Sequence, residues 1–145
     1  MKLSEGGFNS LADKASQSVQ AIYSSALSDN ADKNALGFSE SFSDEGFSSL
    51  ISDIQQSVFF GNNYISVSDI TVSSIAVKNG FEDYELNCRA SKDICLAFDF
   101  DYTYKISNSA ENTEEVRGET GSASIYYTYE NGEWRISDIS LYAYF

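Results

Sequence analysis

Two aspartates that stand two residues apart are the first candidates for chemistry in this sequence. Asp99 and Asp101 occupy alternate positions of a segment that reads as a β-strand, so their side chains share one face. Two carboxylates at that spacing can raise one pKa, as a general acid–base pair requires. They would act in this way only on a face that lines a cavity, and the surrounding alternation assigns them to the opposite, solvated face. We therefore expect neither aspartate to be catalytic.

Aromatic and apolar residues fill the other face of the same segment. From Ile94 to Ile106 every second residue is apolar, which is typical of a strand with one buried face. A curved sheet can leave part of such a face unfilled, as an apolar pocket with tyrosine hydroxyls at its rim. Packing of the core is the alternative role for the same rings. The candidate pocket residues are Tyr23, Phe98, Phe100, Tyr102, Tyr127, Tyr129 and Trp134.

The chain ends in a predicted β-hairpin. Asn131-Gly132 separates two runs rich in aromatic and β-branched residues, and this dipeptide tolerates the positive φ angles of a tight type I′ turn. A two-residue turn sets Tyr129 opposite Trp134 and Tyr127 opposite Ile136. Such cross-strand pairs of large side chains stabilise one face of a sheet.

The second strand of this hairpin changes its apolar phase partway along. A bulge near Ser137-Asp138 would return its apolar residues to one face, because one extra residue restores the alternation. The bulge leaves three tyrosines on the outer face, and adjacent exposed rings indicate a contact surface. They are Tyr126, Tyr142 and Tyr144. We expect a homodimer in which two such faces pair around a two-fold axis.

The composition limits the possible partners. The chain has 145 residues, a formal net charge of −13 and a pI near 4.1. Nucleic acids and anionic membrane surfaces need clustered lysine and arginine, so neither is expected as a partner. No apolar run is long enough to span a membrane, and the first residues lack the hydrophobic stretch of a signal peptide. If the protein is exported, its signal lies outside this sequence.

Several kinds of catalysis are excluded by composition. The chain contains no histidine, which rules out histidine-based acid–base chemistry and Ser-His-Asp triads. Two cysteines without histidine make a poor zinc site. The segment 32–37 has the glycine of a calcium-binding loop, but Leu36 and Ser43 stand where that loop needs ligands. We predict no catalytic residue, no metal and no cofactor.

The two cysteines, Cys88 and Cys95, leave two interpretations open. A two-residue turn at Ser91-Lys92 would place them opposite each other, as a disulfide requires. Aligning the apolar faces of the two strands instead pairs Cys88 with Ile94 or Leu96 and leaves two buried thiols. The cysteines therefore do not identify the redox compartment.

The first part of the chain predicts three helices. Apolar residues recur at helical spacing from Phe8 to Ala26, with Asn9 or Ser10 as the cap and Ser28 to Asn30 as the end. A shorter second helix is expected from Asp32 to Phe38. The third begins after Ser43-Asp44 and continues to Val58.

From residue 64 onward the apolar period changes to two, which indicates strands. Tyr64 to Lys78 reads as one long strand with bulges at Ser68-Asp69 and Ser73-Ser74, and Tyr84 to Ala90 as a short one. The polar stretch from Asn108 to Gly121 is interpreted as a mobile loop. The expected fold is a single α+β domain over residues 1–145, with three N-terminal helices packed on a strongly curved antiparallel sheet of about five strands.

Three segments resemble the nuclear transport factor 2-like superfamily. They are Val19 to Leu27 in the first helix, Asp29 to Leu36 after it, and the terminal Tyr129 to Ile139 with its tight turn and Trp-x-Ile pattern. The resemblance covers nearly the whole chain and implies a cone-shaped fold in which a bent antiparallel sheet curls around helices. It also implies a choice of functions, because the superfamily includes both enzymes and non-catalytic domains.

The resemblance implies a non-enzymatic domain that binds a partner protein or a small apolar ligand. It also implies a bacterial envelope or secreted protein, with a cytoplasmic one as the alternative location. The alternative function is a ketosteroid isomerase- or dehydratase-like enzyme, in which Tyr23 would donate to an oxyanion and a carboxylate would act as base. An open pocket that contains both groups would favour the enzyme.

Overall fold

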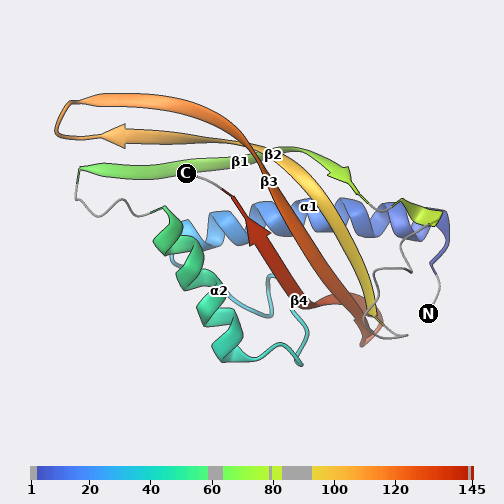
Figure 1. Cartoon of the computed structure of the whole chain (residues 1–145). Helices are drawn as coiled ribbons and strands as arrows, with labels where there is room; N and C mark the ends of the chain where they lie inside the picture. Colours follow the sequence, from blue (N-terminus) through green and yellow to red (C-terminus); the bar gives the residue numbers. More distant parts are fainter. Residues whose placement is uncertain (1–2, 59–63, 79, 83–92, 144) are drawn as a thin grey trace.

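The computed structural model describes residues 3–58, 64–78, 80–82, 93–143 and 145 (Figure 1). It has an α+β architecture in which the helices precede an antiparallel sheet. The helices are α1 (Glu5–Leu27) and α2 (Asp44–Ser57), and the strands are β1 (Ile65–Val77), β2 (Asp93–Asn108), β3 (Thr113–Glu130) and β4 (Glu133–Tyr142). No helix in this described part of the chain combines the length and the apolar character of a membrane span.

Both helices begin at serine caps. The Ser4 hydroxyl accepts a hydrogen bond from the Gly7 backbone at 3.0 Å, so the cap of α1 lies five or six residues before the predicted Asn9 or Ser10. Ser28 ends α1, as predicted. The Ser43 hydroxyl caps α2 by accepting from Gly46, which confirms the predicted start of that helix.

The predicted helix from Asp32 to Phe38 was wrong, and the described residues contain two α-helices rather than three. The segment forms turns because its polar groups are satisfied locally. The Asp32 carboxylate accepts from the backbone of Ala35 at 2.9 Å, and Gly37 takes a φ of 84°, which no helix allows. Phe38 then forms a parallel bridge with Ile136 of β4.

The sheet is a meander with the strand order β1-β2-β3-β4. Bulges interrupt the pairing of β1 with β2 near Ser68 and Ser73, as the parity slips predict. The expected strand from Tyr84 to Ala90 lies outside the described residues. The predicted strong curvature was wrong, because the sheet is bent but not strongly curled. Of the two helices in the described residues, α1 runs along the sheet and α2 points away from it (Figure 1). Strong curvature would be required to cover several helices, whereas this sheet covers α1.

The closing hairpin has the predicted register. Asn131 and Gly132 have φ angles of 51° and 81°, as a type I′ turn requires. Tyr129 pairs with Trp134. The register shifts by one residue at Ser137, which confirms the predicted bulge in β4.

The stretch from Asn108 to Gly121 is mostly strand, so its interpretation as a mobile loop was wrong. Only residues 109–112 form the turn, in which the Asn108 side chain accepts from the backbone of Ala110 and Glu111. From Thr113 onward β3 pairs with β2 without a break. Its side chains are exposed on both faces up to residue 120, and this removes the apolar alternation by which a strand is detected.

The core lies between α1 and the inner face of the sheet. Leu96, Phe98 and Phe100 of β2 are fully or almost fully buried, as the alternation predicts. They meet the buried stripe of α1, which recurs at helical spacing from Phe8 to Ala26. The side chains of Phe38, Phe47 and Ile54 belong to the same buried cluster and extend it to α2.

Glycine at position 121 is required by close packing in β3. A Cβ atom there would lie 2.5 Å from the Tyr142 carbonyl oxygen and 2.7 Å from Cζ of Phe100, whereas one at Gly118 would meet nothing nearer than 3.8 Å. We expect Gly121→Ala to lower the free energy of unfolding in urea by about 2 kcal/mol, through overpacking. Gly118→Ala, the matched control, should change it by less than about 1 kcal/mol. Equal effects of the two variants would contradict this packing argument.

Candidate functional site

Five of the seven predicted pocket residues lie together in the core. Tyr23, Phe98, Phe100, Tyr102 and Tyr127 are each at most 2% exposed. The Tyr23 ring lies 6.3 Å from that of Phe100 and 6.1 Å from that of Phe145, and Phe145 in turn lies 5.5 Å from Tyr102. These ring contacts fill the space beside Tyr23 with side chains.

Among the buried tyrosines, Tyr23 and Tyr127 have hydroxyls that are shielded from water. Burial raises the pKa of Tyr23, and the neighbouring Tyr102 raises it further. Burial also raises the pKa of Tyr127. The side chain of Ser18 lowers this pKa, but by a smaller amount. The Tyr127 hydroxyl makes no hydrogen bond of normal geometry within the described structure. Among the described residues, the buried polar residue is Ser39. No carboxylate of this part of the chain is buried beside Tyr23.

The other two predicted pocket residues lie at the tip of the closing hairpin. Tyr129 and Trp134 make an edge-to-face contact with ring centroids 5.1 Å apart. Tyr129 is 47% exposed and Trp134 is half-buried. The structure therefore separates this pair from the five core residues.

The predicted outer-face tyrosines differ in exposure. Tyr142 is 67% exposed on β4, whereas Tyr126 is half-buried on β3. Tyr126 pairs with Asp138, while Tyr142 pairs with Ser122, which lies four residues before Tyr126 in β3. Tyr144 lies outside the described residues, as does Cys88. Cys95 is buried, and the two interpretations of the cysteines stay open.

The two aspartates that opened the sequence analysis lie on the outer face of β2. Asp99 forms an ion pair with Lys78 at 3.1 Å, and Asp101 accepts from the Thr120 hydroxyl at 2.8 Å. Their partners are surface side chains rather than the walls of a cavity. No cluster of His, Cys, Asp and Glu within the described ranges has the geometry of a metal site.

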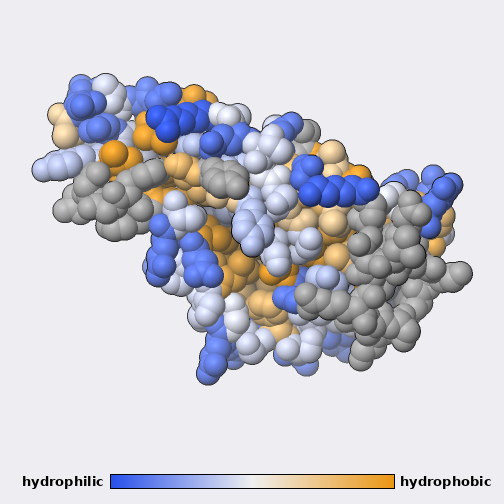
Figure 2. Space-filling view, viewed as in Figure 1, coloured by the Kyte–Doolittle hydropathy of each residue, from blue (hydrophilic) through white to orange (hydrophobic). Residues whose placement is uncertain are grey.

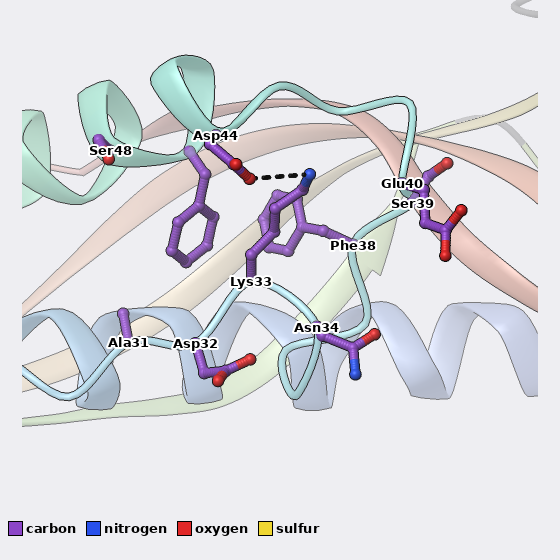
Figure 3. Close-up of a pocket in the computed structure, with 10 residues that line it drawn as sticks. Ala31, Asp32, Lys33, Asn34, Phe38, Ser39, Glu40, Asp44 and Ser48 are labelled. Carbon is purple, nitrogen blue, oxygen red and sulfur yellow. Dashed lines mark hydrogen bonds and ion pairs between the residues drawn. The ribbon is translucent and has the colours of Figure 1, made fainter.

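An open surface pocket of about 620 Å3 lies between the segment 31–40 and the start of α2 (Figure 3). Its apolar floor includes Phe38 and Phe47, whose rings are in edge-to-face contact 5.1 Å apart. Apolar surface also shows between α2 and β4 on the face drawn in Figure 2. The pocket thus combines an apolar base with access from solvent.

The rim of this pocket is acidic. Asp32, Glu40 and Asp44 line it, and Lys33 is the one cation among the described residues that line it. Lys33 reaches toward Asp44 and forms an ion pair at 3.3 Å (Figure 3). The Asp44 side chain is nevertheless 95% exposed, so this pair is weak and open to competition. The pocket can therefore attract a basic group to an apolar surface.

The segment that forms one wall of the pocket is joined to β4 by backbone hydrogen bonds. Ser39 donates its N–H to the carbonyl of Ile136 at 2.8 Å, and Ile136 donates to the carbonyl of Gly37 at the same distance. Ser39 is fully buried. This bridge holds residues 37–39 beside β4 although about a hundred residues separate them along the chain.

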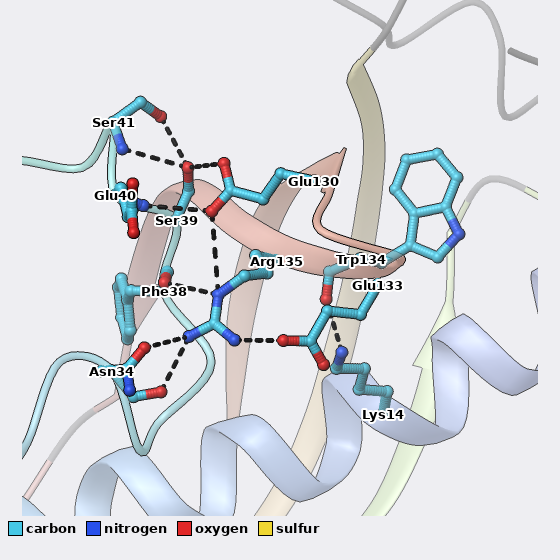
Figure 4. A network of polar contacts seen from close by, with 10 residues as sticks. All are labelled: Lys14, Asn34, Phe38, Ser39, Glu40, Ser41, Glu130, Glu133, Trp134 and Arg135. Carbon is cyan, nitrogen blue, oxygen red and sulfur yellow. Dashed lines mark hydrogen bonds and ion pairs between the residues drawn. The ribbon is translucent and has the colours of Figure 1, made fainter.

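Arg135 supplies the cation at the centre of this junction (Figure 4). Its Nε donates to the Phe38 carbonyl at 2.9 Å, and Nη2 donates to the carbonyl and the side-chain oxygen of Asn34 at 2.8 and 3.0 Å. Its Nη1 pairs with Glu133. The planar guanidinium thus satisfies several acceptors at once, which a lysine could not do.

Glu130 completes the junction from β3. Its carboxylate accepts from the Ser39 hydroxyl at 2.7 Å and from the Glu40 backbone at 3.2 Å. We call Arg135, Glu130 and their partners in residues 34–40 the clamp. No pattern in the sequence marks it, because its members alternate with apolar residues around an ordinary hairpin turn and their partners lie far upstream.

Comparisons with known proteins bear on the fold alone. No family model and no curated protein matches the chain. The crystal structure of the intermembrane space region of the chloroplast protein ARC6 is similar, with a TM-score of 0.55 and 13% sequence identity over 99% of each chain. At this identity the similarity shows a shared fold and nothing of activity.

The clamp should contribute strongly to stability. We expect Arg135→Lys to lower the free energy of unfolding by about 2 kcal/mol, since lysine leaves carbonyl acceptors of residues 34–38 without a donor. Amide hydrogen exchange of Ser39 and Ile136 should accelerate as well. Arg117→Lys, at an exposed arginine, is the matched control and should change neither measurement. An unchanged exchange rate at Ser39 in Arg135→Lys would contradict the role of the clamp.

The raised pKa values of Tyr23 and Tyr127 predict that the protein loses stability at alkaline pH. Their folded-state pKa values lie above the ordinary value of 10.0, so their contribution is complete below about pH 10 and is lost as the pH rises further. We expect Tyr127→Phe to be neutral or stabilising by up to about 1 kcal/mol at pH 7, and to reduce the alkaline loss. Urea unfolding at pH 7 and pH 11 measures both. A strongly destabilised Tyr127→Phe would show that its hydroxyl is bonded.

Proposed function

We propose that this protein is a non-enzymatic binding domain that takes a segment of a partner protein into the acidic pocket beside α2. The observation that carries the proposal is the position of the open space. The space lies at the surface between residues 31–40 and α2, while the aromatic face expected to form a ligand pocket is packed with side chains. A binding function therefore belongs to the surface pocket.

The packing around Tyr23 supports a binding role over the alternative enzyme. A ketosteroid isomerase-like reaction needs a carboxylate base and room for a substrate beside the donor tyrosine. Tyr23 instead contacts the rings of Phe100 and Phe145, with no buried carboxylate in the described part of the molecule. The raised pKa of Tyr23 would also weaken it as a hydrogen-bond donor to an oxyanion.

The chemistry of the pocket indicates what the partner segment carries. The floor of Phe38 and Phe47 suits an apolar side chain, and the carboxylates of Asp32 and Glu40 suit a neighbouring lysine or arginine. The net charge of −13 favours the approach of such a basic segment. An apolar residue flanked by basic ones is therefore the expected ligand, rather than a small apolar molecule.

Three further expectations are proposed separately from the pocket. Membership of the nuclear transport factor 2-like superfamily and location in a bacterial envelope or secreted protein stay predictions from the resemblance. The homodimer through Tyr126, Tyr142 and Tyr144 is also a prediction, for which the exposure of Tyr142 is the supporting observation. These expectations do not depend on the pocket, and the pocket does not depend on them.

A block of the pocket tests the proposed function. Peptides selected from a random displayed library should carry an apolar residue beside lysine or arginine, and Ser48→Trp should weaken their binding at least tenfold by filling the pocket. Ser49→Trp is the matched control, because Ser49 is an exposed neighbour on α2 that does not line the pocket. Fluorescence polarisation measures both affinities. Peptides that bind the two variants equally, or a library that yields no binder, would disprove the proposal.

A further inference from the structure

The first half of β3 is a free edge of the sheet within the described structure. β3 pairs with β2 along its whole length, but β4 pairs with it only from Ser122 onward. Residues 113–120 therefore have β2 on one side and no described strand on the other (Figure 1). Backbone N–H and C=O groups on that open side can accept a further strand.

The side chains of this edge are exposed and carry charges of both signs. Residues 113–120 are all exposed, and Val116 is 68% exposed. Glu115 and Arg117 lie on the inner face, where they form an ion pair at 3.1 Å. Glu119, on the same face, accepts from the Tyr104 hydroxyl at 2.8 Å. Charged side chains on an edge commonly oppose pairing, so the order of the charges decides whether a strand can add here.

This order of charges is complementary to itself in an antiparallel pair. In a two-fold symmetric pair of strands one residue lies opposite its own copy, and its neighbours on either side lie opposite each other. With Val116 at the centre, Glu115 faces the copy's Arg117, and Arg117 faces the copy's Glu115. Glu114 then faces Gly118, and Thr113 faces Glu119. No two like charges lie directly opposite each other, and the exposed Val116 side chains meet.

Other symmetric registers are worse. A centre at 115 or 117 places identical charges opposite each other at the axis itself. A centre at Gly118 also pairs Arg117 with Glu119, but it brings the incoming strand opposite Ser122, where β3 already pairs with Tyr142 of β4. The register centred on Val116 pairs residues 113–119 and ends before Ser122, where the pairing with β4 begins.

We propose that two copies of this chain associate edge to edge, with residues 113–119 of β3 paired antiparallel about Val116, to form one continuous sheet. This inference goes beyond the proposed function and does not rest on it, because the pocket lies at α2. The contact is one pair of short strands, so the association is reversible and depends on concentration. It uses neither Tyr126 nor Tyr142 and is distinct from the outer-face dimer.

Exchange of the two charges tests the register. Arg117→Glu places Glu opposite Glu, and Glu115→Arg places Arg opposite Arg, so each variant should weaken dimerisation at least tenfold in sedimentation equilibrium. These variants shift the net charge in opposite directions, so a loss in both is not a net-charge effect. The double variant Glu115→Arg/Arg117→Glu restores opposite signs across the axis and should recover the wild-type affinity. Circular dichroism and urea unfolding confirm that all variants fold.

A cysteine cross-link gives a second readout. Under mild oxidation Val116→Cys should form a covalent dimer, because each residue 116 lies opposite its copy, whereas Glu114→Cys lies opposite Gly118 and should not. Tyr142→Ser should leave the association unchanged. The proposal is overturned by a wild-type chain that stays monomeric up to about 1 mM, by a double charge variant that stays as weak as the single ones, or by equal cross-linking of the two cysteine variants. Loss of the dimer in Tyr142→Ser would assign it to the outer face instead.

Discussion

The burial of one face of β2 against α1 is the interaction on which the rest of the structure depends. β2 is flanked by β1 and β3, and its inward rings meet the apolar stripe of α1 at Tyr23 and its neighbours. Because side chains alternate along a strand, this single choice of face also determines which residues of β1 and β3 point inward. A shift of one residue would bury Asp99 and Asp101 and expose Phe98 and Phe100, so the register is strongly specified.

The parts of the fold that could be predicted from the sequence are those with local signals. α1 and α2 show helical periodicity, α2 begins at its predicted serine cap, the bulges of β1 appear as parity slips, and Asn131-Gly132 can form few structures other than a tight turn. The first half of β3 has no such signal, because its side chains are exposed to solvent on both faces. The buried apolar residues of this strand pair belong to β2. The segment 32–38 misleads in the opposite sense. Its spacing suits a helix, but the Asp32 side chain and Gly37 favour turns.

The candidate site was harder to predict than the fold. Aromatic residues at every second position of a strand show the same pattern whether they fill a core or line an open pocket. The contact of Tyr23 with Phe145 decides between the two, and it joins the first helix to the last residue of the chain. The acidic pocket also involves remote residues, since Arg135 and Ile136 bind the backbone at and beside Phe38. Periodicity describes which face of an element is apolar, but not which distant segment will cover it.

The separation between the two halves of the clamp has a consequence for the order of folding. The meander and its hairpins form between sequence neighbours, whereas the bonds from Arg135 to Asn34 close a loop with a separation of 101 residues. Closing a loop of that length from an unfolded chain costs about 4 kcal/mol of entropy, so the bridge is favourable only after the sheet has brought its ends together. Residues 34–40 should therefore dock late in folding and detach early in partial opening, while β2 and α1 stay assembled. The wall of the pocket then belongs to a segment that opens before the core does, and a ligand bound there would stabilise this segment against opening.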